Sequence, residues 1–398
     1  MRLYATVITC IFFAPALFCQ TPTISRLKKD VQASRTPAEK LQTLLFLCDQ
    51  GYSLHPDTLL HYANTALELA DRLNNKPDEV KARYYISFAL TNKGMIDSSL
   101  TVADHCLAIL NSGVKDPMLV LHVLNQRGRC FMRKNKYKEA IEMGYRVISG
   151  AEAEKSILLQ MKGKTLVGWA YLEMGQSAEA LKWHLSALRT SPDTVQQQRY
   201  SILFANLALN YSGLGKRDSG FYFIERAIRY SRQNEDLFAL SNSLAIYAQL
   251  LVRSGQAPLA EEPLKEVIVI RKLIGDPFYI VSDMAQLGLY YAHNGQPEKG
   301  IAICNEGILI ARQYGIITKL SFLYGTLAEN YKAAGKTGDY VQALERLISL
   351  KDSVYQSNSA VALAELQTRY ELEIKENTII RHCFTLVKKN FFLYGSLL

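Results

Sequence analysis

A turn-forming residue recurs every forty residues along this chain. The positions are Asn135, Gly175, Gly215, Gly255, Gly295 and Gly335. Seven residues before each of them lies a glycine or alanine, and four residues before each lies an aromatic or leucine residue. Because several positions recur together in one register, the chain contains an internal repeat, and a repeat of this length decides the fold class.

Each repeat predicts two helices around a tight turn. In the unit 161–200, apolar residues keep a helical period on both sides of Gly175. Gly175 itself stands where a helix C-terminus needs a left-handed backbone conformation, and Pro192 ends the second helix. One helical hairpin cannot bury both of its faces, whereas stacked hairpins can. The sequence therefore predicts a solenoid.

The spacing within the unit resembles the tetratricopeptide repeat (TPR). The matching residues are Val167-Gly168, Tyr171, Gly175, Ala180, Ala187-Leu188 and Pro192. The register continues upstream to Gly94 after a one-residue slip, and a degenerate first unit begins at Pro37. The resemblance implies an all-α fold: a right-handed superhelical TPR solenoid of about eight 40-residue repeats over residues 37–352, followed by a C-terminal helix.

The N-terminus predicts export. Residues 1–20 combine Arg2, an apolar stretch and small residues near its end, which is typical of a cleaved signal peptide. The apolar stretch is shorter than the roughly 20 residues of a membrane-spanning helix. Lipid modification at Cys19 is the alternative, although Phe18 occupies a position where that signal prefers a small residue. We expect the mature chain to be periplasmic, or anchored in the inner membrane and facing the periplasm.

The C-terminal part predicts a different structure. Residues 353–387 form a charged helix with a narrow apolar stripe, which favours either a coiled coil, and with it a homodimer, or a helix that caps the solenoid. Residues 388–398 begin with a lysine pair followed by aromatic and apolar residues, as a transmembrane helix begins. We expect the intact protein to meet the membrane through this end.

The order of these parts resembles a bacterial family of membrane sensors. In that family the solenoid and a similar charged helix precede a membrane span, and the span leads to a histidine kinase or a helix-turn-helix regulator. This chain has neither domain, so the resemblance implies the extracytoplasmic sensor half, truncated at the start of its transmembrane helix. The alternative is a free-standing periplasmic TPR scaffold for envelope complexes.

Nothing in the sequence predicts catalysis. The His-Glu-x-x-His, Gly-x-Ser-x-Gly and Cys-x-x-Cys motifs do not occur, and the seven histidines stand singly. The five cysteines after residue 20 have no metal-ligand spacing, and several stand at small apolar repeat positions, which indicates buried thiols. The net charge of +9 lies partly at the chain ends, which suits a membrane surface better than nucleic acid. We therefore expect no enzyme activity, cofactor, metal or nucleic-acid partner.

The TPR resemblance also implies where a ligand binds. In that family, peptides lie against the first helix of each pair, on the concave face. Carried over position by position, this face holds Tyr84, Phe88, Asn125, Arg129, Arg133, Trp169, Asn206, Gln249 and Arg253, with Lys81, His122 and Lys162 beside them.

The N-terminal half of this face is basic and aromatic, which favours an acidic protein or peptide ligand held by charge-assisted bonds and stacking. A solvated helix face of similar composition is the alternative. If the face binds a ligand, replacement of Arg129 and Arg133 should weaken binding and leave fold stability nearly unchanged.

Overall fold

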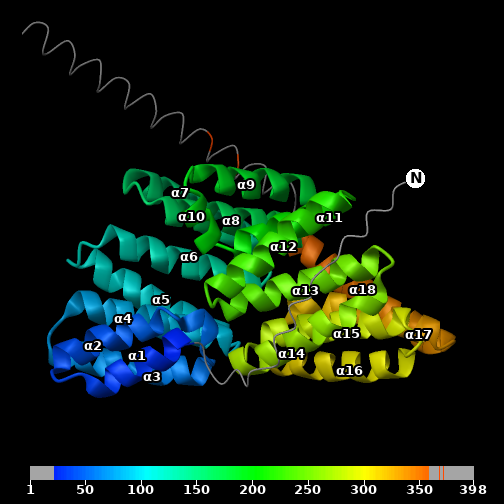
Figure 1. Cartoon of the computed structure of the whole chain (residues 1–398), viewed down its shortest axis with the longest axis horizontal. Coiled ribbons are helices and arrows are strands. Elements are labelled where there is room, and N and C mark those ends of the chain that lie inside the picture. Colours follow the sequence, from blue (N-terminus) through cyan, green and yellow to red (C-terminus); the bar gives the residue numbers. More distant parts are fainter. Residues whose placement is uncertain (1–21, 358–366, 368–370, 372–398) are drawn as a thin grey trace, which may run out of the picture.

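The computed structural model describes residues 22–357, 367 and 371, and every regular element in this part of the chain is a helix (Figure 1). The helices are α1 (Pro22–Ala33), α2 (Pro37–Cys48), η1 (Gly51–Ser53), α3 (Pro56–Arg72), α4 (Lys76–Asn92), α5 (Ile96–Asn111), α6 (Pro117–Arg133), α7 (Tyr137–Ala153), α8 (Ile157–Glu173), α9 (Ser177–Thr190), α10 (Thr194–Arg199), α11 (Ile202–Gly213), α12 (Arg217–Gln233), α13 (Leu237–Arg253), η2 (Ala257–Ala260), α14 (Glu261–Ile274), α15 (Pro277–His293), α16 (Pro297–Gln313), α17 (Ile317–Ala333) and α18 (Thr337–Ser357).

The helices form eight successive hairpins, which we call units 1 to 8. They are α2–α3, α4–α5, α6–α7, α8–α9, α11–α12, α13–α14, α15–α16 and α17–α18. The predicted all-α solenoid of eight helix pairs is thereby confirmed. Two helices were not predicted: α1 packs against α2 ahead of the first unit, and the short α10 lies between units 4 and 5.

The helix ends explain the register seen in the sequence. Most complete helices contain 17 residues and are joined by three-residue turns, so a helix end falls about every twenty residues. Gly175 has φ +77°, and Asn135 adopts the same left-handed conformation at φ 61°. The turns between units contain the same conformation: Gly275 and Gly315 occupy it after units 6 and 7, whereas Asn74 (φ 51°), Lys155 (φ 54°) and Glu235 (φ 53°) occupy it after units 1, 3 and 5. The structural period is therefore half of the sequence period.

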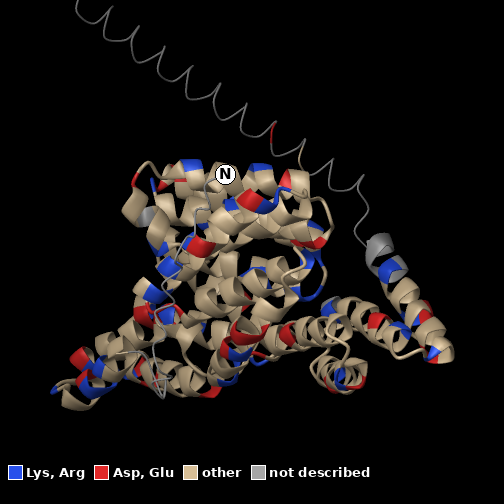
Figure 2. Cartoon of the chain, turned by 45° about the vertical axis from the view of Figure 1, so that its right-hand side comes forward, with Lys and Arg blue, Asp and Glu red and all other residues tan. Residues whose placement is uncertain are grey.

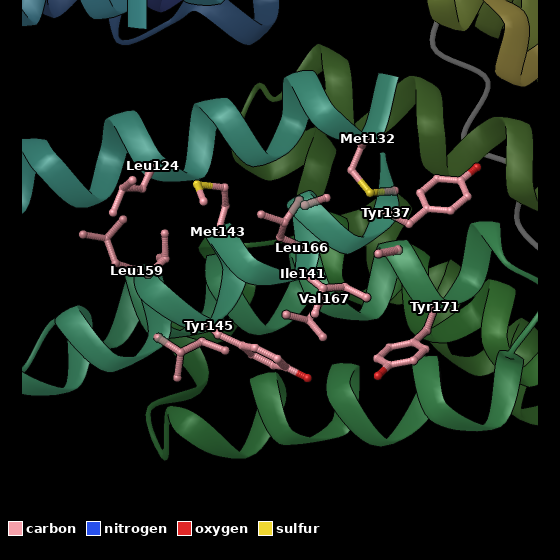
Figure 3. Packing of buried hydrophobic residues seen from close by; sticks show 14 of the residues in the cluster. Leu124, Met132, Tyr137, Ile141, Met143, Tyr145, Leu159, Leu166, Val167 and Tyr171 are labelled. Atoms are coloured by element: carbon pink, nitrogen blue, oxygen red, sulfur yellow. The ribbon is translucent and has the colours of Figure 1, made fainter. Parts of the chain in front are cut away.

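Close helix packing accounts for the small residues of the repeat. A Cβ atom on Gly168 would lie 2.6 Å from the buried ring of His184, and one on Gly288 would lie 2.6 Å from Cys304 Sγ. Apolar side chains fill the remaining space between successive hairpins, as Figure 3 shows for α6, α7 and α8. The cysteines within the described residues are free and buried, as their repeat positions predict. Cys383 lies outside the described residues.

The solenoid coils back on itself, so that the N-terminal units touch the C-terminal units (Figure 1). The turn around η1 contacts both α13 and α14. The backbone N–H of Leu237 donates a hydrogen bond to Ser53 Oγ across 184 residues of sequence, at 3.2 Å. The rings of Tyr52 and Phe238 lie 5.1 Å apart between the same segments. The inner side of the coil is therefore partly enclosed by the protein itself.

The predictions for the chain ends fall mostly outside the described residues. This applies to the signal peptide at 1–20, to most of the charged helix at 353–387, and to the apolar segment at 388–398. α18 extends to Ser357, and further along the chain the described Gln367 accepts a hydrogen bond from Tyr171 of α8 at 3.2 Å. Within the described helices, none has the length and apolar character needed to cross a membrane.

Candidate ligand-binding site

The first helix of each unit lies on the inner side of the coil. The helices α2, α4, α6, α8, α11, α13 and α15 each pack against the first helix of the next unit, whereas the second helices contact mainly their own partner and the following first helix. Charged residues of both signs are distributed over the whole coil, as Figure 2 shows. The inner side therefore differs from the rest of the coil in how its charged side chains are arranged, and not in the sign of their charge.

The predicted site residues occupy very different environments on these inner helices. Phe88, Arg129 and Arg133 are buried, Tyr84, Asn125, Trp169, Asn206 and Gln249 are half-buried, and Arg253 is exposed. The structure brings Tyr84, Phe88 and Arg129 together on α4 and α6, but nothing in the described contacts joins Arg253 or Gln249 to this group.

Arg129 is the central cation of the N-terminal part. Its side chain is 9% exposed and lies between two aromatic rings, with the guanidinium carbon 5.0 Å from the ring of Tyr52 and 4.5 Å from that of Phe88. Its Nη1 donates a hydrogen bond to Gln126 at 3.0 Å. The flat cation is therefore fixed in position by stacking rather than by a carboxylate.

Arg133 corrects the expectation that both arginines lie on an open groove. It forms an ion pair with Asp276 at the start of α15, and the two side chains are only 3% and 1% exposed. The guanidinium also donates to the backbone carbonyl of Thr91 and lies against the rings of Phe278 and Tyr279. The expectation that replacing Arg133 leaves stability unchanged is wrong, because its removal strands a buried carboxylate.

Trp169 belongs to a second contact between distant units. It packs beside the apolar cluster of α15 to α17, and its indole N–H donates to Glu173 at 3.1 Å. Glu173 also accepts a hydrogen bond from Lys319 at 3.0 Å, across 146 residues of sequence. Trp169 therefore helps to hold α8 against α17.

A basic group remains on the inner surface around Arg129. Lys162 of α8 is half-buried and has neither an ion pair nor a hydrogen bond to the described residues. Burial lowers the pKa of Lys162, the neighbouring charge of Arg129 lowers it further, and Asp49 partly opposes these effects. Burial and the charges of Lys162 and Lys81 hold the pKa of His122 at about 4, so His122 is neutral at physiological pH.

Sequence reasoning missed a further charged pair that joins units 6 and 7. Arg271 Nε donates to Asp283 at 2.8 Å, and the guanidinium stacks on Tyr279 at 4.4 Å. The repeat register did carry a signal for it. Arg271 stands one repeat from Ser231 and Ala311, which are buried in the neighbouring units. A charge at such a small, buried position requires a partner.

The described residues contain no group of three or more His, Cys, Asp or Glu side chains arranged to hold a metal ion.

Comparison with known proteins finds no matching family model and no matching curated protein. Solved structures do match. A Rap protein complexed with Competence and Sporulation Factor is 12% identical, with 84% of this chain and 97% of that chain covered and a TM-score of 0.59. The apo form of the quorum sensor NprR from B. thuringiensis is 14% identical, with 82% and 92% covered and a TM-score of 0.54. NprR in complex with its cognate peptide NprX is 15% identical, with 86% and 100% covered and a TM-score of 0.53.

At these identities the matches establish the fold. They agree with the repeat register, the eight hairpins and the left-handed turn residues. The described part of the chain therefore has the fold of the tetratricopeptide-repeat proteins.

Proposed function

We propose that this chain binds a protein or peptide ligand on the inner surface of its coil and does not catalyse a reaction. The observation that carries the proposal is the inner group of Lys81, Lys162, Arg129 and Tyr84, in which cations stand beside aromatic rings and Lys162 forms no hydrogen bond or ion pair with the described residues. An acidic ligand would supply the missing negative charge, and aromatic rings would supply flat apolar contacts.

The solved structures that match this chain support the proposal. Two of the matching structures are complexes, one of a Rap protein with Competence and Sporulation Factor and one of NprR with its cognate peptide NprX. By analogy, the coil of this chain would enclose a short extended ligand.

The test is binding of a random-sequence heptapeptide pool to the purified chain, followed by intrinsic tryptophan fluorescence. Tyr84→Ala on the inner surface should weaken binding, because it removes a half-buried ring that lies 5.9 Å from His122. Tyr222→Ala is the matched control, because Tyr222 is an exposed ring on α12. Equal loss in both variants, or no binding by the wild-type chain, would contradict the proposal.

We further propose that the chain is the extracytoplasmic sensor part of a membrane signal transducer. The order of an N-terminal export signal, a solenoid, a charged helix and a basic-aromatic end supports this role. Reading the DNA after the codon for Leu398 tests it: a full span followed by a kinase or helix-turn-helix domain is expected, and unrelated sequence would count against it.

The second candidate is a free-standing periplasmic scaffold, favoured by the completeness of the eight units. Cell fractionation separates the two roles. A scaffold should remain in the periplasmic fraction without detergent, whereas a sensor should be found with the inner membrane.

A further inference from the structure

The ligand-facing positions of units 2 and 3 are covered by other parts of the same chain. Phe88, Arg129 and Arg133 stand where the repeat resemblance places a bound ligand, yet each is more than nine-tenths buried. Tyr52, from the η1 turn of unit 1, covers two of them: its ring lies 4.6 Å from the ring of Phe88 and 5.0 Å from the guanidinium carbon of Arg129. Tyr84, one helical turn before Phe88 on α4, remains half-buried. The inner surface of α4 is therefore accessible at Tyr84 and closed at Phe88.

The start of unit 7 covers the third position. Asp276 forms the buried ion pair with Arg133, and the rings of Phe278 and Tyr279 lie 4.8 and 5.7 Å from the Arg133 guanidinium carbon. A carboxylate and two rings on one short segment are the groups expected of a ligand for this basic and aromatic face. Segment 276–279 thus occupies the place on α6 where the resemblance expects a ligand.

Further contacts join the same parts of the coil, and together with the Arg133–Asp276 pair we call them the closing interface. They connect α1 and the turns of units 1, 2 and 4 with the segments at which units 6, 7 and 8 begin. They are the hydrogen bonds of Thr23 N–H to Glu235 at 3.2 Å and of Leu237 N–H to Ser53 Oγ at 3.2 Å, the ion pair of Lys319 with Glu173 at 3.0 Å, the packing of Tyr314 against Gly94, and the ring contact of Tyr52 with Phe238. Because each contact joins two distant parts of the chain, all of them can break while every hairpin stays folded.

We propose that the closed coil is a self-occluded state, in which Tyr52 and segment 276–279 occupy the ligand-facing positions of units 2 and 3 until the closing interface opens. This inference rests on the proposed function, since it states how access to the inner surface is controlled. A ligand that uses Phe88 or Arg133 binds only the open arrangement, so its apparent affinity is reduced in proportion to the fraction of open coil. By the same linkage, the ligand shifts the population towards the open arrangement.

Amide hydrogen exchange at Leu237 reports the closing interface directly. Leu237 is the first residue of α13, so its N–H has no acceptor within the helix and is protected by Ser53 Oγ of unit 1. Asp276→Asn should speed this exchange about ten-fold or more, because loss of the buried counter-charge of Arg133 favours the open arrangement. Amides in the middle of α6 and α15 should still exchange more slowly than Leu237, because the hairpins stay folded in the open arrangement. An exchange rate at Leu237 equal to that of the wild type would overturn the proposal.

A second variant opens the interface from its other end. Glu173→Gln removes the counter-charge of Lys319, but its side chain can still accept the indole N–H of Trp169. It should also speed exchange at Leu237. Glu266→Gln is the matched control, because it removes an exposed ion pair with Arg232 outside the closing interface and should leave this exchange unchanged. Equal acceleration in all three variants would show that Leu237 reports general stability, and would overturn the proposal.

The heptapeptide pool then tests occlusion itself. Asp276→Asn should bind the pool about ten-fold more tightly than the wild type does, and Glu173→Gln should shift the affinity in the same direction. Adding the pool to the wild-type chain should speed exchange at Leu237, because the bound ligand selects the open arrangement. If Asp276→Asn exchanges faster but binds with wild-type affinity, segment 276–279 closes the coil without blocking the ligand, and the proposal is overturned.

Failure of the self-occlusion is distinguishable from failure of the proposed function. If the pool binds the wild type and both opened variants equally, and slows exchange at Leu237, the ligand binds the closed coil and only the self-occlusion is wrong. If no peptide binds to the wild type or to either opened variant, the proposed function is wrong, and the self-occlusion is wrong with it.

Discussion

Replacing Asp276 by asparagine should destabilise the coil, because it removes the counter-charge of Arg133. Both side chains are almost fully buried, and they join α6 to the start of α15 across 143 residues of sequence. Asparagine has nearly the same shape and is itself a good N-cap, so it can still accept the backbone N–H of Phe278. The charge is therefore the main property that the substitution changes.

The magnitude follows from the partners that Arg133 retains. Removing one member of a buried ion pair typically costs about 3–5 kcal/mol. Arg133 would keep its hydrogen bond to the Thr91 carbonyl and its contacts with Phe278 and Tyr279, so we expect the low end, about 3 kcal/mol. In a chain of this length, that corresponds to a fall of about 5 °C in Tm.

Chemical denaturation of wild type, Asp276→Asn, Arg133→Met and the double variant gives the coupling energy between the two residues. The double variant should recover part of the loss, because it no longer contains an unpaired buried charge. Glu266→Gln is the matched control: Glu266 pairs with Arg232 on the exposed surface at 3.0 Å and should contribute about 0.2–1 kcal/mol. If Asp276→Asn lowers the free energy of unfolding by no more than Glu266→Gln does, the buried pair does not hold the coil together.

Three further predictions concern the repeat itself. Gly168→Leu should strongly destabilise unit 4, because the larger side chain would overpack against His184. Circular dichroism should show a lowered Tm, and a Tm equal to that of the wild type would contradict the prediction. Because Gly175 and Lys155 both have positive φ, Gly175→Ala should lower the free energy of unfolding by about 1–2 kcal/mol, and Lys155→Gly should raise it by about 1 kcal/mol. Urea titrations that show the opposite signs would refute the turn assignment. Burial lowers the pKa of His184 to about 4, below its usual 6.5 in the unfolded chain, so the folded state binds fewer protons between these values. Stability should therefore be complete above about pH 6.5 and fall by up to about 3 kcal/mol as the pH drops to 4, and a His184→Asn variant should show a shallower slope.

The sequence could predict the hairpins because each unit obeys the same local rules. Gly175 and Asn135 mark helix ends that depend only on neighbouring backbone, and Gly168 marks a contact within one unit. Some turns between units were harder to see, because Lys155 and Glu235 occupy left-handed positions there, whereas glycine fills the corresponding positions at Gly275 and Gly315.

The contact between distant units could not be predicted in the same way. It depends on the small rotation from each unit to the next, which accumulates over four or five units before Arg133 meets Asp276. For this reason the position-by-position comparison placed Arg133 on an open surface. Tyr84, Arg129 and Lys162 lie on α4, α6 and α8, the first helices of their units, but their exposure depends on the same curvature.

The contact of the η1 turn with α13 and α14 changes how this protein should fold. An open repeat array can lose terminal repeats one at a time, because each repeat touches only its neighbours. Here units 1 and 6, which are distant in sequence, stabilise each other through Ser53, Leu237, Tyr52 and Phe238. The chain cannot complete its coil during synthesis until unit 6 has emerged, so its early half must wait in an incomplete state. The closed repeat array thus combines modular local structure with the high contact order of a globular domain.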